Sequence, residues 1–454
     1  MLTSSRCWVL VFFVTWHATA PAFVSDAHAL SQDEEIRISR QFRREARRNL
    51  EFVEDPEVEL FVDRIGRRIL KAVGNPTYQY RFFVIRDDSL NAFAVPGGSI
   101  FMHTGLIEKV DSTDELASVM AHEVVHVDAR HIARMSGPDA TSLLGLFGIL
   151  LGPAAIIGQA ISVARQLEFS RGLEEEADNL GVRYLSGAGY NPHASIGFMN
   201  KMYRETILNP IGAPAYLLTH PLTQKRINNL TASIRSQRLS VPRYKRDDAI
   251  KRVQLLIRLK EEPGPIMKSL EKRYHAQPED PEATHLLGIA YGANGDWVRA
   301  RDQLEQALQL GPVIPGIDRD LGRAYTQTRQ FQKAHKAFQR AVRHEPDNPV
   351  TQLYLGELFE KEADYRGAVR SYLRARQLAP LWPEVARRLG YTYRKLNRAG
   401  EAHYYLAQSH LLQDEEQKAI ESLERAVREY REGSPRVQVI RDEIEVIRAR
   451  LNNE

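Results

Sequence analysis

Residues 112–134 read STDELASVMAHEVVHVDARHIAR, and this stretch decides how the first half of the chain folds. It opens with Ser112-x-x-Glu115, which has the form of a capping box at the start of a helix. We expect a single helix that runs from this serine to about Arg134. The same helix carries the residues that indicate the chemistry of the chain.

His122 and His126 lie four residues apart in this helix, so both imidazoles lean from one face toward a common point. That spacing suits two ligands of a tetrahedral zinc ion. Glu123 lies one step round the helix, where it can reach a water at the metal but is poorly placed to be a ligand. It is therefore the predicted general base. Chance alone gives on the order of 0.03 such motifs in a chain of this length, so the signal is strong.

Two histidines leave a zinc site incomplete, so a third ligand must come from elsewhere in the chain. The metzincin spacing fails, because His131 lies nine residues after His122 on the opposite side of the helix. We expect His131 to be a packing or surface histidine. Residues 170–178 read SRGLEEEAD and offer a better candidate. Glu174 and Asp178 are one helical turn apart, so Glu174 can bind the metal while Asp178 accepts the spare ring N–H of a ligand histidine.

These motifs carry a family resemblance. HEVVH at 122–126 followed by SRxxExxAD at 170–178 resembles the HtpX and CAAX-prenyl-protease type of zinc metallopeptidase, a gluzincin family, and more narrowly its periplasmic BepA-like branch. Three further stretches agree with the family: NAFAVPGG at 91–98, TGLI at 104–107, and THP at 219–221 followed by Arg226-Ile227. The resemblance covers roughly residues 34–233.

The resemblance implies one zinc ion per chain. Its ligands would be His122, His126 and Glu174, with Glu123 as catalytic acid/base and Asp178 orienting a ligand. The implied activity is hydrolysis of peptide bonds.

His220 and Arg226 are added by the resemblance alone. His220 is similar to a family histidine that closes the site or helps the reacting oxyanion, and Arg226 follows six residues later, as in relatives. Without the resemblance, His220 is more typical of a helix cap or a surface position. We expect an extended substrate to add a strand to the sheet edge near residues 98–102, unless that strand is merely a covered edge.

Before the motif helix, short β-like runs at 80–86, 92–95 and 99–103 predict a small sheet. Residues 30–71 follow a helical pattern with a row of arginines on its polar side. Such a row is typically a solvated face, with contact to anionic lipid as the alternative. The row consists of Arg37, Arg40, Arg43, Arg44, Arg47 and Arg48.

Composition and the first residues bear on class and compartment. The 454 residues include 62 Lys and Arg against 58 Asp and Glu, and 43% are hydrophobic. This excludes a disordered, disulfide-stapled or polytopic membrane protein and indicates no nucleic-acid function. Residues 1–29 predict a signal peptide, cleaved after Ala29, with a retained anchor as the alternative. Cleavage removes Cys7, the only cysteine. We expect a periplasmic protein, with peripheral association with the outer membrane as an open alternative.

Residues 143–161 read LLGLFGILLGPAAIIGQAI, and hydropathy alone nominates them as a transmembrane helix. Their position excludes a single crossing, which would put His126 and Glu174 on opposite sides of the membrane. Two crossings would need about 40 apolar residues. Gly152-Pro153 favours a helix-turn-helix flap. The flap is either buried against the catalytic domain or dips into a membrane surface, and the resemblance favours membrane contact.

The C-terminal third is a repeat array. Glycines recur every 34 residues, each preceded by leucine, followed three residues later by an aromatic and twelve later by alanine. This is the tetratricopeptide pattern, whose superhelix offers a groove for peptides or partner proteins, with a stabilising appendage as the alternative. The glycines are Gly288, Gly322, Gly356 and Gly390.

The expected fold is therefore mainly α with a small β-sheet in an α+β zincin-like domain at 30–238, followed by an all-α tetratricopeptide solenoid. A helical linker or atypical repeat at 239–280 precedes repeats at 281–432 and a capping helix at 433–454. The leading hypothesis is a zinc endopeptidase in outer-membrane protein quality control. Its implied partners are misassembled outer-membrane proteins and the β-barrel assembly machinery. The alternatives are a chaperone or scaffold whose metal site is shut by His220, and a zinc hydrolase of non-peptide substrates.

Overall fold

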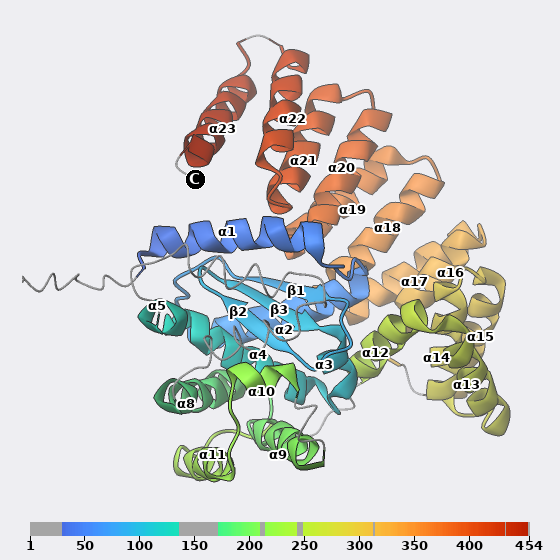
Figure 1. Ribbon diagram of the computed structural model, residues 1–454. Helices are drawn as coiled ribbons and strands as arrows, with labels where there is room; N and C mark the ends of the chain where they lie inside the picture. The colour runs from blue at the N-terminus through green and yellow to red at the C-terminus, as the bar shows by residue number, and fades with distance from the viewer. Residues whose placement is uncertain are drawn as a thin grey trace, which may run out of the picture.

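The computed structural model describes residues 30–135, 171–208, 214–242, 248–311, 314–431 and 433–452. The predicted signal peptide (1–29) and the apolar stretch 143–161 lie outside the described residues. Figure 1 shows a small sheet covered by helices, with a helical array curving along one side of it. The expected fold class is confirmed. Among the residues described, no helix is both long enough and apolar enough to cross a membrane.

The sheet has three strands in the order β1-β3-β2. β1 (Arg81–Ile85) pairs in parallel with β3 (Ser99–His103), and β2 (Ala92–Val95) pairs with the other side of β3 in antiparallel register. The predicted small sheet is confirmed, but the expected substrate-accepting edge at residues 98–102 is wrong. β3 is the central strand, so its backbone groups are used by neighbours on both sides.

Each face of the sheet is covered because side chains of a strand alternate in direction. Phe101 of β3 points to α1 (Gln32–Asn49), where it packs against Phe42 with ring centroids 5.1 Å apart. Ile100 and Met102 point to the opposite face and join the core formed with α2 (Pro56–Val73) and α4 (Thr113–Asp128). The short α3 (Thr104–Lys109) follows β3.

The motif helix α4 begins as predicted but ends early. Ser112 caps it by accepting from the backbone N–H of Glu115 at 3.2 Å. The expected continuation to Arg134 is wrong, because Arg130 adopts a left-handed conformation at φ 55° and α5 (His131–Met135) starts in a new direction. The side chain of Arg130 stabilises this turn by donating to Glu35 Oε1 at 2.6 Å and to the carbonyl of Leu30, both far away in sequence.

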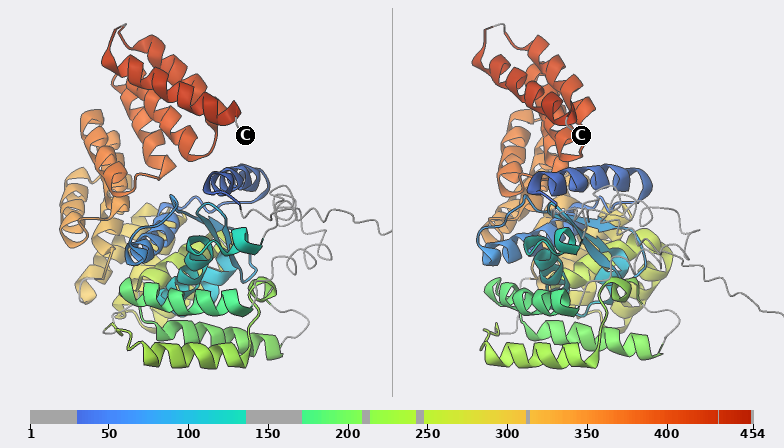
Figure 2. Two further views of the ribbon diagram at one scale, coloured as in Figure 1. Left: turned by 90° about the vertical axis from the view of Figure 1, so that its left-hand side faces the viewer. Right: turned by 60° about the vertical axis from the view of Figure 1, so that its left-hand side comes forward.

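Four helices cover α4 on the side away from α1: α8 (Arg171–Gly187), α9 (His193–Leu208), α10 (Ala215–Thr219) and α11 (Gln224–Ser236). Figure 2 shows these green helices below the sheet, opposite the blue α1 and the red C-terminal helices. α8 lies against α4, and α11 packs on α8 and α9 through Ile227 and Leu230. This stack positions the candidate site.

The repeat array begins after two helices of less regular sequence, α12 (Asp248–Glu261) and α13 (Pro263–Ala276). Helix pairs then follow at the predicted period. The repeat glycines let the paired helices approach: a Cβ on Gly322 would lie 2.7 Å from the Phe338 ring, and one on Gly356 would lie 2.3 Å from the Tyr372 ring. The helices are α14 (Pro281–Ala293), α15 (Trp297–Leu310), α16 (Ile317–Gln327), α17 (Phe331–His344), α18 (Pro349–Lys361), α19 (Tyr365–Leu378), α20 (Pro383–Lys395), α21 (Ala399–Leu412), α22 (Glu416–Glu429) and α23 (Pro435–Asn452).

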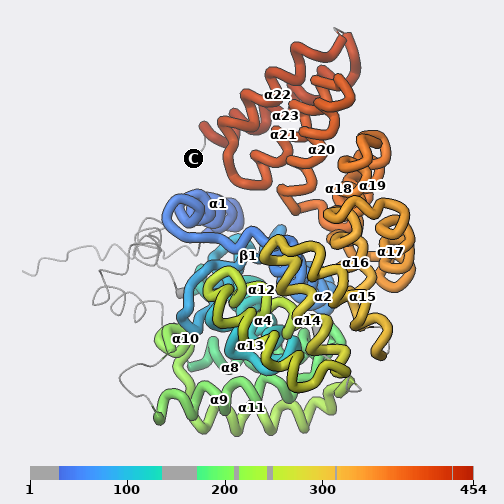
Figure 3. The backbone as a smooth tube through the Cα atoms, turned by 90° about the vertical axis from the view of Figure 1, so that its right-hand side faces the viewer, coloured from blue at the N-terminus to red at the C-terminus, as the bar shows by residue number. Residues whose placement is uncertain are grey.

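The C-terminal helices contact the start of α2. Figure 3 shows the C-terminal helices passing from α12 beside α2 to α23 above α1. Leu60 of α2 belongs to the hydrophobic core of the array, and Trp382 donates its indole N–H to Glu59 Oε2 at 3.0 Å. Glu57 lies 3.1 Å from both Arg319 and Arg252. Part of the surface of the C-terminal helices is therefore occupied by the chain itself.

A second contact joins α1 and β1 to the end of α21. Asp414 accepts from Arg43 at 2.6 and 2.8 Å and from Arg81 at 3.0 Å, and all three side chains are almost completely buried. Arg44 lies 3.3 Å from Glu416. The arginine row of α1 was expected to be a solvated face, and for Arg43 and Arg44 that expectation is wrong, because the array covers them.

The Asp414 contact predicts that D414N destabilises the protein. The variant leaves two buried guanidinium groups without a carboxylate, so the free energy of unfolding in urea should fall by about 3 kcal/mol. Asp347, whose side chain is 86% exposed, provides the control, and D347N should change the same quantity by less than about 0.5 kcal/mol. Equal effects of the two variants would contradict a structural role for the buried contact.

Glu59 predicts a pH dependence at the α2 contact. Burial raises the pKa of Glu59 to about 8 from its ordinary 4.5, outweighing the opposing hydrogen bond from Trp382. Folding therefore favours the protonated form of Glu59. The contribution of Glu59 to the free energy of unfolding is complete below pH 4.5 and is lost as the pH rises from 4.5 to about 8.

E59Q keeps the acceptor for Trp382 without the buried charge. It should raise the free energy of unfolding at pH 8 by about 2 kcal/mol and have little effect at pH 4.5. Urea titrations at both pH values measure this, with E445Q, at a side chain 72% exposed, as the control. A gain that is the same at both pH values would refute the assignment.

Candidate metal centre

The site lies where α4 and α8 pack together. His122, Glu123 and His126 are buried on α4, and Glu174 and Asp178 are buried on α8. A helix repeats its direction every three to four residues, so the spacing of four within each pair keeps its two members on one face. Residues distant in sequence come together because the two helices pack, which brings Glu174 to His122 and His126.

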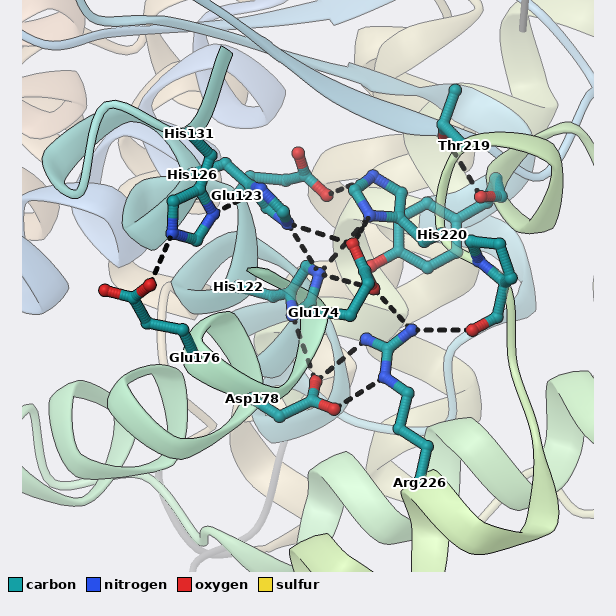
Figure 4. A network of polar contacts seen from close by, with 12 residues as sticks. His122, Glu123, His126, His131, Glu174, Glu176, Asp178, Thr219, His220 and Arg226 are labelled. Carbon is teal, nitrogen blue, oxygen red and sulfur yellow. Dashed lines mark hydrogen bonds and ion pairs between the residues drawn. The ribbon is translucent and has the colours of Figure 1, made fainter. Parts of the chain in front are cut away.

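The ring nitrogens of the two histidines and the Glu174 carboxylate converge (Figure 4). His126 Nε2 lies 3.0 Å from His122 Nε2 and 3.4 Å from Glu174 Oε1, and His122 Nε2 lies 3.5 Å from Glu174 Oε2. Ligand atoms about 2.0–2.1 Å from a tetrahedral zinc ion are about 3.3 Å from one another. The three predicted ligands therefore have the separations that zinc requires.

His220 supplies a fourth donor to the same point. Its Nδ1 atom lies 2.9 Å from Glu174 Oε1 and 3.4 Å from His122 Nε2, so all four ligating atoms lie within 4.8 Å of one another. It follows the last residue of α10, and its ring lies against that of Tyr216 with centroids 4.6 Å apart. His220 Nε2 lies 3.4 Å from Glu123 Oε1. The structure thus puts His220 inside the cluster and not at a surface cap.

Asp178 and Arg226 lie behind the ligands. Asp178 Oδ1 is 3.1 Å from Nδ1 of His122, the ring nitrogen that faces away from the cluster. Arg226 donates two hydrogen bonds to Asp178, at 2.6 and 2.9 Å, and also pairs with Glu174. Asp178 has the place that the sequence predicted for it. Arg226 was expected among the catalytic residues, and its contacts are those of a residue that positions two carboxylates.

The charges of the cluster balance one another. Burial opposes ionisation of Glu174, but the charges of His220 and His122 and their hydrogen bonds hold its pKa well below its ordinary range. Burial also opposes protonation of His122, yet Glu174 and Asp178 raise its pKa to about 9. For Glu123, burial dominates and raises the pKa. A general base works best with a pKa near the operating pH, so the rise suits the role predicted for Glu123.

The residues present fit a zinc ion. Three imidazole nitrogens and one carboxylate oxygen are donors that zinc accepts, and the side chains that bear them are buried. The ring nitrogen that His122 turns away from the cluster has a carboxylate partner, as ligand histidines usually do. The type of the donor atoms, the distances between them and the carboxylate partner of His122 all agree with a zinc site.

Sequence reasoning expected His131 only as a packing or surface histidine and did not single out Glu176 or Tyr216, yet all three lie close to the donors. His131 is buried with its Nδ1 atom 2.9 Å from Nδ1 of His126, because the turn at Arg130 folds it back. Glu176, in the run of three glutamates, lies 3.4 Å from His131. Tyr216 lies against His220. No local pattern identifies any of the three, since each is placed by a turn or by helix packing.

Comparisons with known proteins agree with this geometry. Residues 56–234 match the model of peptidase family M48, and residues 319–383 and 401–432 match models of the tetratricopeptide repeat. The family implies a metal, and the matched residues contain the four donors described above.

Several curated relatives are similar to part of the chain. A beta-barrel assembly-enhancing protease of Escherichia coli K12 is 30% identical over 243 residues, which cover 48% of this chain and 50% of the relative. One of Yersinia pestis is 30% identical over 216 residues, with 44% of each chain covered. The mitochondrial metalloendopeptidase OMA1 of Schizosaccharomyces pombe is 33% identical over 179 residues, covering 38% of this chain and 51% of the relative. The chain thus spans about half the length of the curated relatives it matches.

The pairing of Arg226 with two carboxylates predicts a metal-dependent loss of stability. In R226A without metal, buried Glu174 and Asp178 lose their common cation, and the free energy of unfolding should fall by about 3–5 kcal/mol. Added zinc should recover part of that loss by neutralising Glu174. R235A is the control, since Arg235 is an exposed residue of the same helix α11. Thermal melts with and without zinc would contradict the assignment if R226A and R235A behaved alike.

Proposed function

Because residues 56–234 belong to peptidase family M48, we propose that this chain is a periplasmic zinc endopeptidase acting on misassembled or unfolded envelope proteins during outer-membrane protein assembly and quality control. The observation that carries the proposal is the convergence of His122, His126 and Glu174 with tetrahedral separations beside the buried carboxylate of Glu123. Two of the relatives are beta-barrel assembly-enhancing proteases, which supports a role in envelope protein assembly.

Each residue of the proposed site has its own role in hydrolysis. His122, His126 and Glu174 would hold a zinc ion, which when bound would activate water and polarise the peptide carbonyl. Glu123 accepts a proton from the attacking water and returns it to the leaving amine. Asp178 fixes the ring of His122 through its Nδ1 atom, and Arg226 holds Asp178 in place.

Main-chain recognition of an extended substrate is assigned to β2. The central position of β3 removes residues 98–102 from that role, whereas β2 is an edge of the sheet and packs against α4, which carries the ligands. A strand added at an edge is held by backbone hydrogen bonds, which depend little on sequence. Such binding suits a protease that acts on unfolded chains.

The array is assigned to partner binding, outside the part that holds α2. Tetratricopeptide arrays bind peptides and proteins, and two of the relatives are beta-barrel assembly-enhancing proteases. Misassembled outer-membrane proteins and the β-barrel assembly machinery are therefore the proposed partners. The signal peptide predicted at 1–29 and the apolar sequence of 143–161 support the proposal of a periplasmic protein in peripheral contact with the outer membrane.

One observation favours a second candidate function. His220 Nδ1 occupies the fourth position of the cluster, where a hydrolytic water would bind, and its Nε2 atom faces Glu123. With His220 as a fourth ligand, the proposed metal site would be shut to water. A chaperone or scaffold that holds clients through its repeats would have such a site permanently.

The variant E123Q separates the two functions. Removing a general base costs about 10²–10⁴-fold in rate, so cleavage of an unfolded β-barrel protein should fall by at least about 100-fold while zinc stays bound. In cells lacking the wild-type protein, E123Q should fail to restore outer-membrane assembly. Full restoration by E123Q would establish the scaffold instead. E174A, expected to lose zinc, and E175Q, expected to keep both zinc and activity, complete the set.

A further inference from the structure

His131 is a buried histidine that has no role in the hydrolysis proposed above. It starts α5, three residues after the end of α4, and its side chain is fully buried. Its Nδ1 atom lies 2.9 Å from Nδ1 of His126, and the two rings meet edge to face with centroids 4.8 Å apart at 82°. A hydrogen bond therefore joins His131 to the side of His126 that faces away from the cluster.

The direction of this hydrogen bond follows from the cluster. His126 Nε2 is the atom that approaches His122 and Glu174, so it must keep its lone pair for the metal. A neutral imidazole carries its proton on the other nitrogen, so Nδ1 of His126 is the donor. His131 Nδ1 must then be the acceptor, which leaves the proton of His131 on Nε2.

Glu176 is placed to fix that second proton. Its Oε2 atom lies 3.4 Å from His131 Nε2 (Figure 4). The same oxygen accepts from Arg134 at 2.9 Å. A carboxylate at Nε2 favours the tautomer of His131 in which Nδ1 is free to accept. Glu176 belongs to the same run of glutamates as Glu174. One turn of α8 therefore supplies both a metal ligand and the carboxylate that orients His131.

The two ligand histidines thus have matching support on their outer sides. His122 Nδ1 faces Asp178, which Arg226 holds, and His126 Nδ1 faces His131, which lies against Glu176. Outer partners of this kind set the tautomer and the orientation of a ligand ring and raise its basicity. The difference is that His126 reaches its carboxylate through an intervening imidazole.

We propose that His131 is a positioning residue that fixes the ring and tautomer of His126 and so strengthens zinc binding, with Glu176 orienting His131. The inference rests on the proposed zinc site, which it deepens. It concerns the affinity for the metal and assigns His131 no contact with substrate.

The test compares H131F with H131N by competition for zinc against a chromophoric chelator. Phenylalanine fills the space without an acceptor, whereas asparagine places an amide oxygen near the position of Nδ1. Loss of an outer partner typically costs 10–100-fold in metal affinity, so H131F should bind zinc about 10–100-fold more weakly than wild type. H131N should stay within about threefold of wild type, because it can accept from His126. Melting of the metal-free variants shows whether each is folded.

Glu176 provides an independent arm that leaves the buried histidine intact. E176Q should weaken zinc binding by a few-fold, in the same direction as H131F but less, because it removes only the charge that orients His131. E175Q is the matched control, since Glu175 is the neighbouring residue of α8 and its side chain contacts Asn229 instead. It should leave the zinc affinity unchanged.

The outcomes separate this inference from the proposed function. Folded H131F with the zinc affinity of wild type would overturn the role of His131 while the zinc site stands. Equal weakening in H131F and H131N would mean that the site needs an imidazole for its packing, which also overturns the proposal. A wild-type protein without measurable zinc affinity would overturn both.

Discussion

The site depends on the electrostatic compensation of two buried carboxylates. Glu174 and Asp178 both lie in the packed layer between α4, α8 and α11, where an uncompensated charge costs several kcal/mol. Arg226 contacts both, and His122 lies 3.5 Å from Glu174 and 3.1 Å from Asp178. Because Arg226 comes from α11, the third helix of the stack is a condition for the first two to carry the ligands. The arrangement of α8 and α11 under the sheet is thereby tied to the chemistry of the site.

The repeat array is connected to this site through α2. One side of α2 places Leu60 in the core of the array, while Val58, Phe61 and Ile65 lie in the core that contains α4. The acidic start of the helix is held by Arg319, Arg252 and Trp382 of the C-terminal half. The array and the ligand helix therefore share a rigid neighbour. A partner that shifted the array would act first on α2 and on the buried Asp414 contact.

Sequence reasoning succeeded where the signal is local. The HExxH spacing, the acidic pair on α8 and the 34-residue repeat each lie within one or two helices, so their periodicity predicts the fold class and the ligands that the structure brings together. The failures are all non-local. The order of strands in the sheet depends on pairing that a run such as 99–103 does not encode. The break after α4 depends on Arg130 reaching Glu35, almost a hundred residues away. The sequence pattern of the arginine row in α1 predicts a solvated face, but the array, which is distant in sequence, covers Arg43 and Arg44.

His220 differs from the other three donors in the group that lies behind it. His122 and His126 are held from behind by Asp178 and His131, and Glu174 is held by Arg226. The outer nitrogen of His220 faces Glu123, the proposed base, and not a group with a structural role. One rotation of His220 away from the cluster would therefore open the fourth ligand position and release Glu123 together. A shut and an open arrangement of the proposed site would therefore differ in a single side chain, which directly follows the short helix α10.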